Sequence, residues 1–156
     1  MKLLFICTHN RCRSILAEAI TNHLGCGQLL AKSAGSQPVG EVHPLSLKYL
    51  AEANISTAGL SSQSWDEHES WQPDIVITVC DAAAGEACPV WFGQSIKVHW
   101  GLTDPSSVDG SEQEIADAFR QTIATLHTRI ETLLGHNLDR MDQQQLSAVF
   151  NALGEN

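Results

Sequence analysis

Positive charge is scarce in this chain. Its 156 residues include 9 lysines and arginines against 18 aspartates and glutamates, which gives a formal net charge of −9 at pH 7. Proteins that bind nucleic acids usually carry a basic footprint, so this balance argues against a nucleic-acid partner. It does not argue against a small anionic substrate, because the local field of a binding loop matters more than the total charge.

Long apolar runs are also missing. No run approaches the roughly 20 residues that a membrane-spanning helix needs, so we expect no membrane partner. The first seven residues faintly resemble a secretion signal, but the apolar part is too short and the polar residues 8–11 follow at once. We therefore expect a cytoplasmic protein. Hydrophobic residues make up 43% and charged residues 17% of the chain, which is typical of one globular domain with a sizeable core.

The cysteines match no known framework. The chain has an odd number of them: Cys7, Cys12, Cys26, Cys80 and Cys88. No spacing among them fits a zinc site or a disulfide scaffold. In a cytoplasmic protein these thiols should stay reduced, and any disulfide is more often transient and catalytic than structural. The 7 histidines show no ligand spacing either, so we assign no metal site.

The most informative stretch runs from an apolar segment, 3–6, through Cys7 to Arg13 and a helix-like pattern. Successive N–H groups of such a strand-to-helix loop can point at one oxyanion, and the helix dipole adds positive potential. Arg13 would supply a two-pronged donor. We expect the Cys7 thiol to titrate well below a free cysteine and to act as a nucleophile. The plainer alternative is an inert buried Cys7 and a surface Arg13. The predicted oxyanion-binding residues are Thr8, His9, Asn10, Arg11, Cys12, Arg13 and Ser14.

Strand-like and helix-like segments alternate along the chain. Strands are expected at 3–6, 29–33, 74–80 and 96–100, and helices at 14–24, 44–53, 66–71, 111–134 and 138–153. This alternation predicts an α/β fold, a three-layer sandwich with a central, mostly parallel four-stranded sheet and helices on both faces. Ligands of such sheets bind beyond the carboxyl ends of the strands, where Cys7 and Cys80 both fall.

A second informative stretch joins Cys80 to Cys88 through alanines and a glycine. An ordinary helix would hold the two α-carbons roughly 12 Å apart. A disulfide needs less than about 7 Å, so pairing would require this segment to loop or unwind. The change should be cheap because small side chains leave few contacts to break. A redox switch is one interpretation, but spacing alone favours two unrelated cysteines.

These motifs resemble those of low-molecular-weight protein tyrosine phosphatases and of the arsenate reductases built on that fold. The Cys7 loop matches their phosphate-binding loop, although His9 and Arg11 replace smaller residues. Arg11 would add positive charge at the loop rim or be merely solvated. Further matches follow in order: Ser33-Ala34-Gly35, the strand 74–80, Cys88-Pro89, His99-Trp100-Gly101 and Asp104-Pro105. The resemblance implies a phosphatase-like catalytic domain over residues 1–135, with residues 136–156 as a C-terminal helical extension of the same domain.

The resemblance also implies an arsenate reductase mechanism. Cys7 would attack arsenate while Asp104 acts as general acid. Cys80 would then attack Cys7, and Cys88 would attack Cys80, so that arsenite leaves and a disulfide is handed along. The reductant would be thioredoxin, or glutathione with glutaredoxin, and phosphate or sulfate would fit the same loop. No bound cofactor is implied.

Minor roles follow from the same resemblance. Asn10 would brace the loop with Ser33 as its partner, and Ser14 would donate a hydrogen bond to Cys7. A plainer role for Ser14 as a helix N-cap is compatible with that bond. In some relatives a potassium ion is bound at the positions of Asn10, Glu18, Ser33 and Asp66. All four residues carry oxygens here, which leaves potassium binding open.

Two other functions remain open on the sequence. A tyrosine phosphatase would hydrolyse phosphate monoesters through a Cys7 phospho-intermediate and would need neither Cys80 nor Cys88. No obvious aromatic pair lies near Asp104 to clamp a phosphotyrosine, which favours the reductase. A redox-responsive binding module would bind the oxyanion without turnover.

Overall fold

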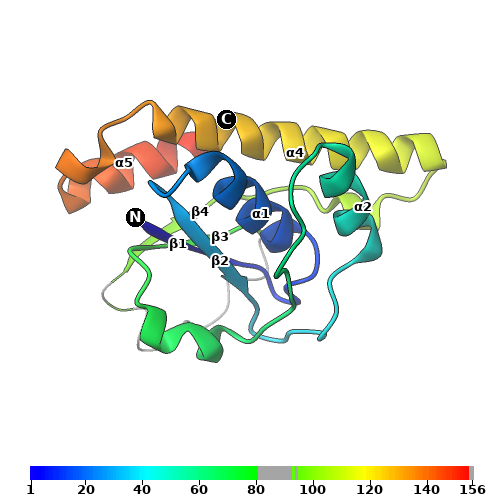
Figure 1. Ribbon diagram of the computed structural model, residues 1–156, viewed down its shortest axis with the longest axis horizontal. Coiled ribbons are helices and arrows are strands. Elements are labelled where there is room, and N and C mark those ends of the chain that lie inside the picture. Colours follow the sequence, from blue (N-terminus) through cyan, green and yellow to red (C-terminus); the bar gives the residue numbers. More distant parts are fainter. Residues whose placement is uncertain (81–92, 94, 155–156) are drawn as a thin grey trace.

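A four-stranded sheet lies at the centre of the computed structural model, which describes residues 1–80, 93 and 95–154 (Figure 1). The strands lie in the order β2-β1-β3-β4, and all three neighbouring pairs are parallel. Their bounds are Lys2–Ile6 for β1, Leu30–Ala34 for β2, Ile75–Thr78 for β3 and Ile96–His99 for β4. The predicted parallel α/β architecture is confirmed.

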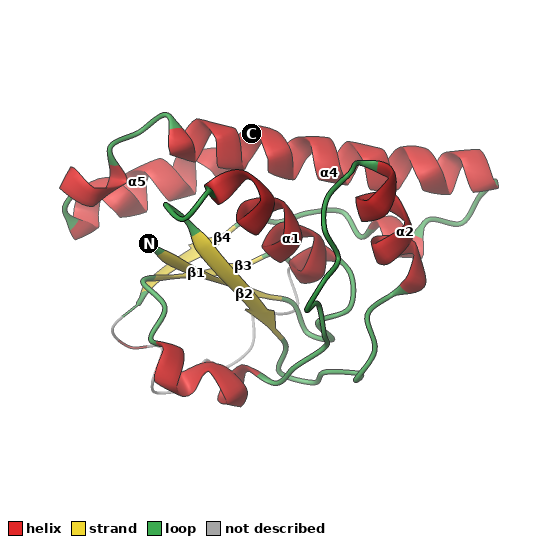
Figure 2. Cartoon of the chain, in the orientation of Figure 1, coloured by secondary structure: helices red, strands yellow, loops and turns green. Residues whose placement is uncertain are grey.

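Helices surround this sheet (Figure 2). The α1 helix packs against β1 and β2 and against α4, and α5 packs beside β4. The short helix η1 packs against β2 and lies on the other side of the sheet from α4 in Figure 1. The α-helices are α1 (Arg13–Gly25), α2 (Pro44–Glu52), α4 (Glu112–Leu134) and α5 (Gln143–Gly154). The 3₁₀ helices are η1 (Trp65–Trp71), η3 (Pro105–Ser107) and η4 (Leu138–Arg140).

The core joins the sheet to the long helix α4. Residues 3–6 of β1 are buried, as expected for a central strand covered on both faces. The ring of Phe5 lies 6.0 Å from that of Trp100 at the end of β4. An apolar stripe at helical spacing runs along α4; it is buried from Phe119 onward, and Ile115 in the first turn is partly buried. A capping box between Ser111 and Glu114 starts this helix.

Two helix predictions need correction. The expected single helix 138–153 is interrupted, because η4 ends at Arg140 and α5 begins only at Gln143. The Asp142 carboxylate accepts a hydrogen bond from the backbone N–H of Gln145 at 2.8 Å, and the Gln145 side chain accepts one from the Asp142 N–H at 3.0 Å. This reciprocal cap satisfies the amides of a new helix start. Ser14 is not a helix N-cap, because α1 begins at Arg13.

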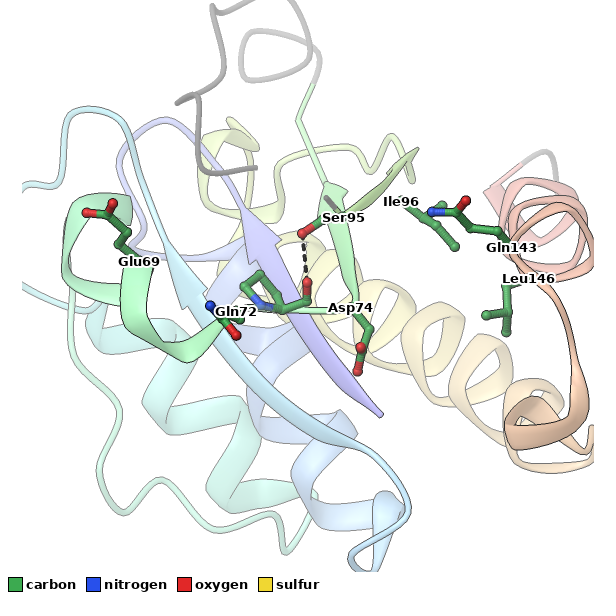
Figure 3. Close-up of a pocket in the computed structure, with 8 residues that line it drawn as sticks. Glu69, Gln72, Asp74, Ser95, Ile96, Gln143 and Leu146 are labelled. Atoms are coloured by element: carbon green, nitrogen blue, oxygen red, sulfur yellow. Dashed lines mark hydrogen bonds between the residues drawn. The ribbon is translucent and has the colours of Figure 1, made fainter. Parts of the chain in front are cut away.

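A cavity of about 540 Å³ lies at the amino ends of β3 and β4 (Figure 3). Asp74 and Ser95 line it, together with Gln143 and Leu146 of α5. This is the opposite edge of the sheet from Cys7 and Cys80, which follow the carboxyl ends of β1 and β3. Within the described part of the chain, no helix combines the length and the apolar character that crossing a membrane requires.

Candidate active site

The loop from Cys7 to Arg13 joins β1 to α1 and turns its carbonyl groups outward. Thr8, His9 and Arg11 each accept a hydrogen bond at their carbonyl oxygen from a residue outside the loop: from Gln37 N at 2.9 Å, from Ser62 Oγ at 3.1 Å and from His43 N at 2.9 Å. A trans peptide points its N–H away from its C=O. The amides of His9, Asn10 and Cys12 therefore face the inside of the loop. Such converging amides form an anion-binding nest at a helix N-terminus.

Asn10 braces this loop from within. Its φ of 48° is left-handed, a conformation that asparagine tolerates better than most residues. The buried side chain donates to Ser14 Oγ at 2.8 Å and to Ser33 Oγ at 2.9 Å, and it accepts from Gln63 N at 2.8 Å. The predicted partnership of Asn10 with Ser33 is confirmed. A hydrogen bond from Ser14 to Cys7 stays a prediction.

The network continues from Ser33 to Glu18. Ser33 Oγ donates to Glu18 Oε1 at 2.5 Å, and burial raises the pKa of the Glu18 carboxyl to about 7, against the opposing effect of that hydrogen bond. Three of the four residues weighed for potassium binding, Asn10, Ser33 and Glu18, are thus joined in one chain of hydrogen bonds. The fourth, Asp66, is exposed on η1. Potassium binding stays a prediction.

Gly35 is required for the approach of the neighbouring loop. A Cβ atom at this position would overlap the carbonyl oxygens of Cys7 and Thr8. The Cys7 amide donates to Ala34 O at 3.2 Å, so the end of β2 lies directly against the start of the anion loop. In the motif Ser33-Ala34-Gly35, Ser33 thus accepts a hydrogen bond from Asn10, and Gly35 leaves room for the carbonyl groups of Cys7 and Thr8.

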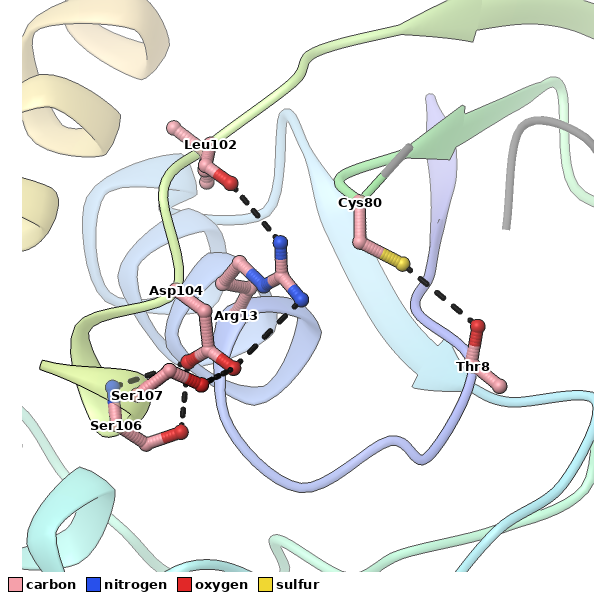
Figure 4. A network of polar contacts seen from close by, with 7 residues as sticks. All are labelled: Thr8, Arg13, Cys80, Leu102, Asp104, Ser106 and Ser107. Atoms are coloured by element: carbon pink, nitrogen blue, oxygen red, sulfur yellow. Dashed lines mark hydrogen bonds and ion pairs between the residues drawn. The ribbon is translucent and has the colours of Figure 1, made fainter. Parts of the chain in front are cut away.

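The structure brings Cys80 to Cys7. The Cys80 thiol lies near enough to act on the Cys7 thiol, and this interaction is the largest cause that raises the pKa of Cys7. The Cys80 sulfur lies 3.8 Å from Thr8 Oγ1 (Figure 4). Both thiols are buried. The cause is topological, because β1 and β3 pair in parallel and their carboxyl ends meet at the same edge. Cys88 lies outside the described residues.

The pKa of Cys7 differs from the sequence-based expectation. The hydrogen bond with Cys80 and burial raise the pKa of the Cys7 thiol, whereas the Arg13 charge and the His9 N–H lower it. The raising effects prevail in this structure. A thiol that shares its hydrogen bond with a second thiol gives up its proton less readily than the loop alone would allow.

Arg13 is held over the loop by the segment that follows β4 (Figure 4). One guanidinium nitrogen donates to Leu102 O at 2.9 Å, and another lies 3.7 Å from an oxygen of Asp104. The guanidinium is therefore fixed near the nest of amides, where a planar donor complements a tetrahedral oxyanion.

Asp104 is held as a carboxylate. It accepts hydrogen bonds from the N–H of Ser106 at 3.0 Å, the hydroxyl of Ser106 at 2.6 Å and the hydroxyl of Ser107 at 3.0 Å. Burial alone would raise its pKa, but these bonds and Arg13 together lower the pKa of Asp104 below its ordinary value. These contacts favour the ionised form of Asp104, and its role as general acid stays a prediction.

Comparison with known proteins agrees with this geometry. The profile of the low molecular weight phosphotyrosine protein phosphatase family matches residues 2–145. The chain belongs to this family. It is 32% identical over 128 residues to an arsenate reductase of Halalkalibacterium halodurans, covering 82% of this chain and 91% of that protein. It is 31% identical over 133 residues to a glutaredoxin arsenate reductase of Synechocystis, covering 85% and 95%. A solved arsenate reductase in the phosphate binding state superposes with a TM-score of 0.70 at 29% identity, covering 86% of this chain and 96% of that one.

Several contacts in this site were not predicted from the sequence. The contact of Arg13 with the carbonyl oxygen of Leu102 could not be foreseen, because a backbone acceptor leaves no sequence motif. Ser106 and Ser107 were recognisable in principle, because Asp-Pro-Ser-Ser is a typical capped start of a short helix. Of the loop substitutions, His9 and Arg11 are both exposed at the rim.

Proposed function

We propose that this protein reduces arsenate to arsenite through Cys7 and a thiol relay. The observation that carries the proposal is the interaction of two buried thiols, Cys7 and Cys80, where the carboxyl ends of β1 and β3 meet. A phosphatase of this family needs only the first of these thiols. A second thiol in contact with the nucleophile is what a two-electron reduction requires.

The loop provides the substrate site. The amides of His9, Asn10 and Cys12 face its interior, and Arg13 lies beside it in a fixed orientation. This arrangement suits a tetrahedral oxyanion of the size of arsenate, phosphate or sulfate. Anion binding brings negative charge against Arg13 and the amides, and it holds arsenic beside the Cys7 sulfur.

The relay transfers two electrons from the thiols to arsenic in three steps. The Cys7 sulfur bonds to arsenic and one arsenate oxygen leaves as water. The Cys80 thiolate then attacks the Cys7 sulfur, so an S–S bond forms, the S–As bond breaks, and its electron pair reduces arsenic to the trivalent state. The Cys88 thiolate attacks Cys80 in turn, which releases Cys7 as a thiolate and leaves a disulfide between Cys80 and Cys88. An external thiol reductant restores both thiols.

The reductant is proposed to be thioredoxin, with glutathione and glutaredoxin as the alternative. A disulfide carried by two cysteines of the chain is a substrate for a dithiol protein. Because the chain is similar to a glutaredoxin arsenate reductase, the experiment tests glutathione with glutaredoxin as well as thioredoxin.

The test is arsenite formation by the reduced protein. We expect turnover with arsenate, thioredoxin, thioredoxin reductase and NADPH, or with glutathione, glutaredoxin and glutathione reductase. Turnover should be lost in Cys7→Ser, Cys80→Ser and Cys88→Ser. Cys26→Ser is the matched control, because Cys26 is an exposed cysteine at the end of α1 and should not affect turnover.

Trapping identifies the steps. After one turnover without reductant, peptide mapping should find a bridge between Cys80 and Cys88 in the wild type. In Cys88→Ser it should find a bridge between Cys7 and Cys80. A protein that makes no arsenite with either reductant but hydrolyses aryl phosphates briskly would be a phosphatase, and the proposal would fail.

A further inference from the structure

We propose that Ser106 and Ser107 are specificity-determining residues that keep Asp104 ionised and thereby suppress phosphate-monoester hydrolysis at this site. The inference rests on the proposed function, because it explains why a phosphatase-type loop would serve reduction rather than hydrolysis. The two serines act through Asp104 and Arg13 and do not lie among the loop residues that face the oxyanion.

The contacts around Asp104 all favour the charged carboxylate. Ser106 Oγ donates to Oδ1 at 2.6 Å, and the Ser106 N–H donates to the same oxygen at 3.0 Å. Ser107 Oγ donates to Oδ2 at 3.0 Å, and Arg13 lies 3.7 Å from that oxygen. A protonated carboxyl would have to give up at least one of these bonds, because an oxygen that carries a proton is a weaker acceptor.

The geometry around the serines is fixed by more than Asp104. Ser106 and Ser107 belong to η3, which begins at Pro105 with Asp104 as its N-cap. The hydroxyls of Ser106 and Ser46 also lie near the buried thiol of Cys12 and act to lower its pKa, against the larger raising effect of burial. The charged or titratable groups that act on Asp104 or respond to it are Arg13, Cys12 and His43. Of these, Arg13 is the permanent cation, so it stabilises the carboxylate at every working pH.

The two reactions differ in their need for an acid. Hydrolysis of a phosphate monoester begins when the Cys7 sulfur bonds to phosphorus and the ester P–O bond breaks. The leaving alkoxide or aryloxide must then take a proton, and Asp104 is the family's donor by resemblance. Water afterwards cleaves the S–P bond. In arsenate the leaving oxygen carries its own proton or takes one from another oxygen of the same ion, so an ionised Asp104 does not block the first step.

An ionised Asp104 still contributes to reduction. With the Leu102 carbonyl it holds two nitrogens of the Arg13 guanidinium, which fixes the donor over the loop. The serines therefore convert the aspartate from a proton donor into a positioning residue for Arg13.

The experiment compares aryl phosphate hydrolysis over a range of pH in the wild type and in Ser106→Ala/Ser107→Ala. Loss of the two hydroxyl donors should move the basic limb of the kcat/KM profile upward by about one pH unit. Hydrolysis at neutral pH should rise about tenfold. Adding Asp104→Asn to the double variant should remove the gain, because an amide cannot donate the required proton in the same way.

Controls separate specificity from structure. Ser106→Thr/Ser107→Thr retains both hydroxyls and should restore the wild-type profile. Ser147→Ala removes a serine hydroxyl on α5 and should leave the profile unchanged. Carbon-detected NMR of the Asp104 carboxyl should show its titration at higher pH in the double alanine variant.

Two results would overturn the inference. One is a double alanine variant whose hydrolysis profile superimposes on the wild type. The other is a gain that survives the addition of Asp104→Asn. Neither assay uses Cys80, Cys88 or a reductant, so failure here is distinguishable from failure of arsenite formation, which would count against the proposed function.

Discussion

The thiols of Cys7 and Cys80 are buried and interact with each other, although the two residues follow different strands. Register explains this contact, because Ile6 of β1 is paired with Thr78 of β3. Each cysteine then follows its strand by one or two residues. The proposed nucleophile, Cys7, and the thiol proposed to attack it, Cys80, thus meet through sheet pairing rather than through any local motif.

The contact between the two thiols should govern the reactivity of Cys7. Because the Cys80 hydrogen bond and burial raise the pKa of Cys7, the thiolate forms only at higher pH than it would in the loop alone. Cys80→Ala removes the first of these effects and leaves the Arg13 charge in place. We expect alkylation of Cys7 by iodoacetamide to become at least about tenfold faster at neutral pH, a shift of one pH unit or more.

Peptide mapping of the alkylated protein measures this effect at Cys7 alone. Cys80→Ser keeps a hydrogen-bonding group and should lie between the alanine variant and the wild type. Cys26→Ala should leave the pH profile unchanged. An identical profile in Cys80→Ala and the wild type would show that the contact does not control ionisation.

Glu18 should make stability depend on pH. Burial raises the folded-state pKa of its carboxyl to about 7. The unfolded chain releases this proton near the ordinary value of about 4.3, whereas the folded chain retains it. Stability is therefore greatest below that value and is lost as pH rises through 7, by about 4 kcal/mol in total.

Urea unfolding at several pH values tests this sign. Glu18→Gln cannot ionise and should flatten the dependence between pH 4.5 and 7. Glu41→Gln is the control, because Glu41 is exposed and its substitution should preserve the slope. A steeper slope in Glu18→Gln would contradict the prediction.

Sequence patterns predicted the parts of the fold that depend on local periodicity. The apolar run of β1 and the stripe of α4 both indicated buried surfaces, and the structure buries them. The break between η4 and α5 was missed because apolar residues keep helical spacing across it. Only the pairing of Asp142 with Gln145 reveals a second helix start.

The site shows the same division. The Cys7 loop and its brace from Asn10 to Ser33 were predictable by resemblance. The ionisation of Cys7 and Asp104 was not, because it depends on which distant groups fold against each thiol or carboxyl. Arg13 illustrates this point, since its orientation is set by Leu102 and Asp104, which follow the last strand, β4, about 90 residues later in the chain.

Gly35→Ala should distort the loop that follows Cys7 and abolish anion binding, while most of the sheet stays folded. The added methyl group would overlap the carbonyl oxygens of Cys7 and Thr8, which forces the anion loop to move. We expect loss of phosphate binding, measured by calorimetry, together with loss of arsenate turnover. Gly135→Ala is the matched control, because Gly135 ends α4 with a helical φ of −77° and its Cβ would meet only ordinary contacts.

Circular dichroism separates local from global damage in this pair. The Gly35→Ala spectrum should remain close to that of the wild type, since the overlap involves a loop rather than a strand interior. Wild-type phosphate affinity in Gly35→Ala would show that the loop does not need this close approach.

Phe150 anchors α5 to the end of β4 and should contribute strongly to stability. It is fully buried, its ring lies 6.1 Å from that of Trp100, and its carbonyl accepts a hydrogen bond from Trp100 Nε1 at 2.8 Å. Trp100 in turn precedes the segment that carries Leu102 and Asp104. Phe150→Ala should therefore reduce the free energy of unfolding by about 3–5 kcal/mol. Urea unfolding measures this loss.

The same substitution tests whether α5 supports the site. A looser Trp100 would let Leu102 shift and weaken its hold on Arg13, so we expect KM for arsenate to rise at temperatures where the variant is still folded. Asn151→Ala changes an exposed neighbour on the same helix and should alter neither stability nor KM. A loss of less than about 1 kcal/mol in Phe150→Ala would mean that α5 packs on the sheet without holding it.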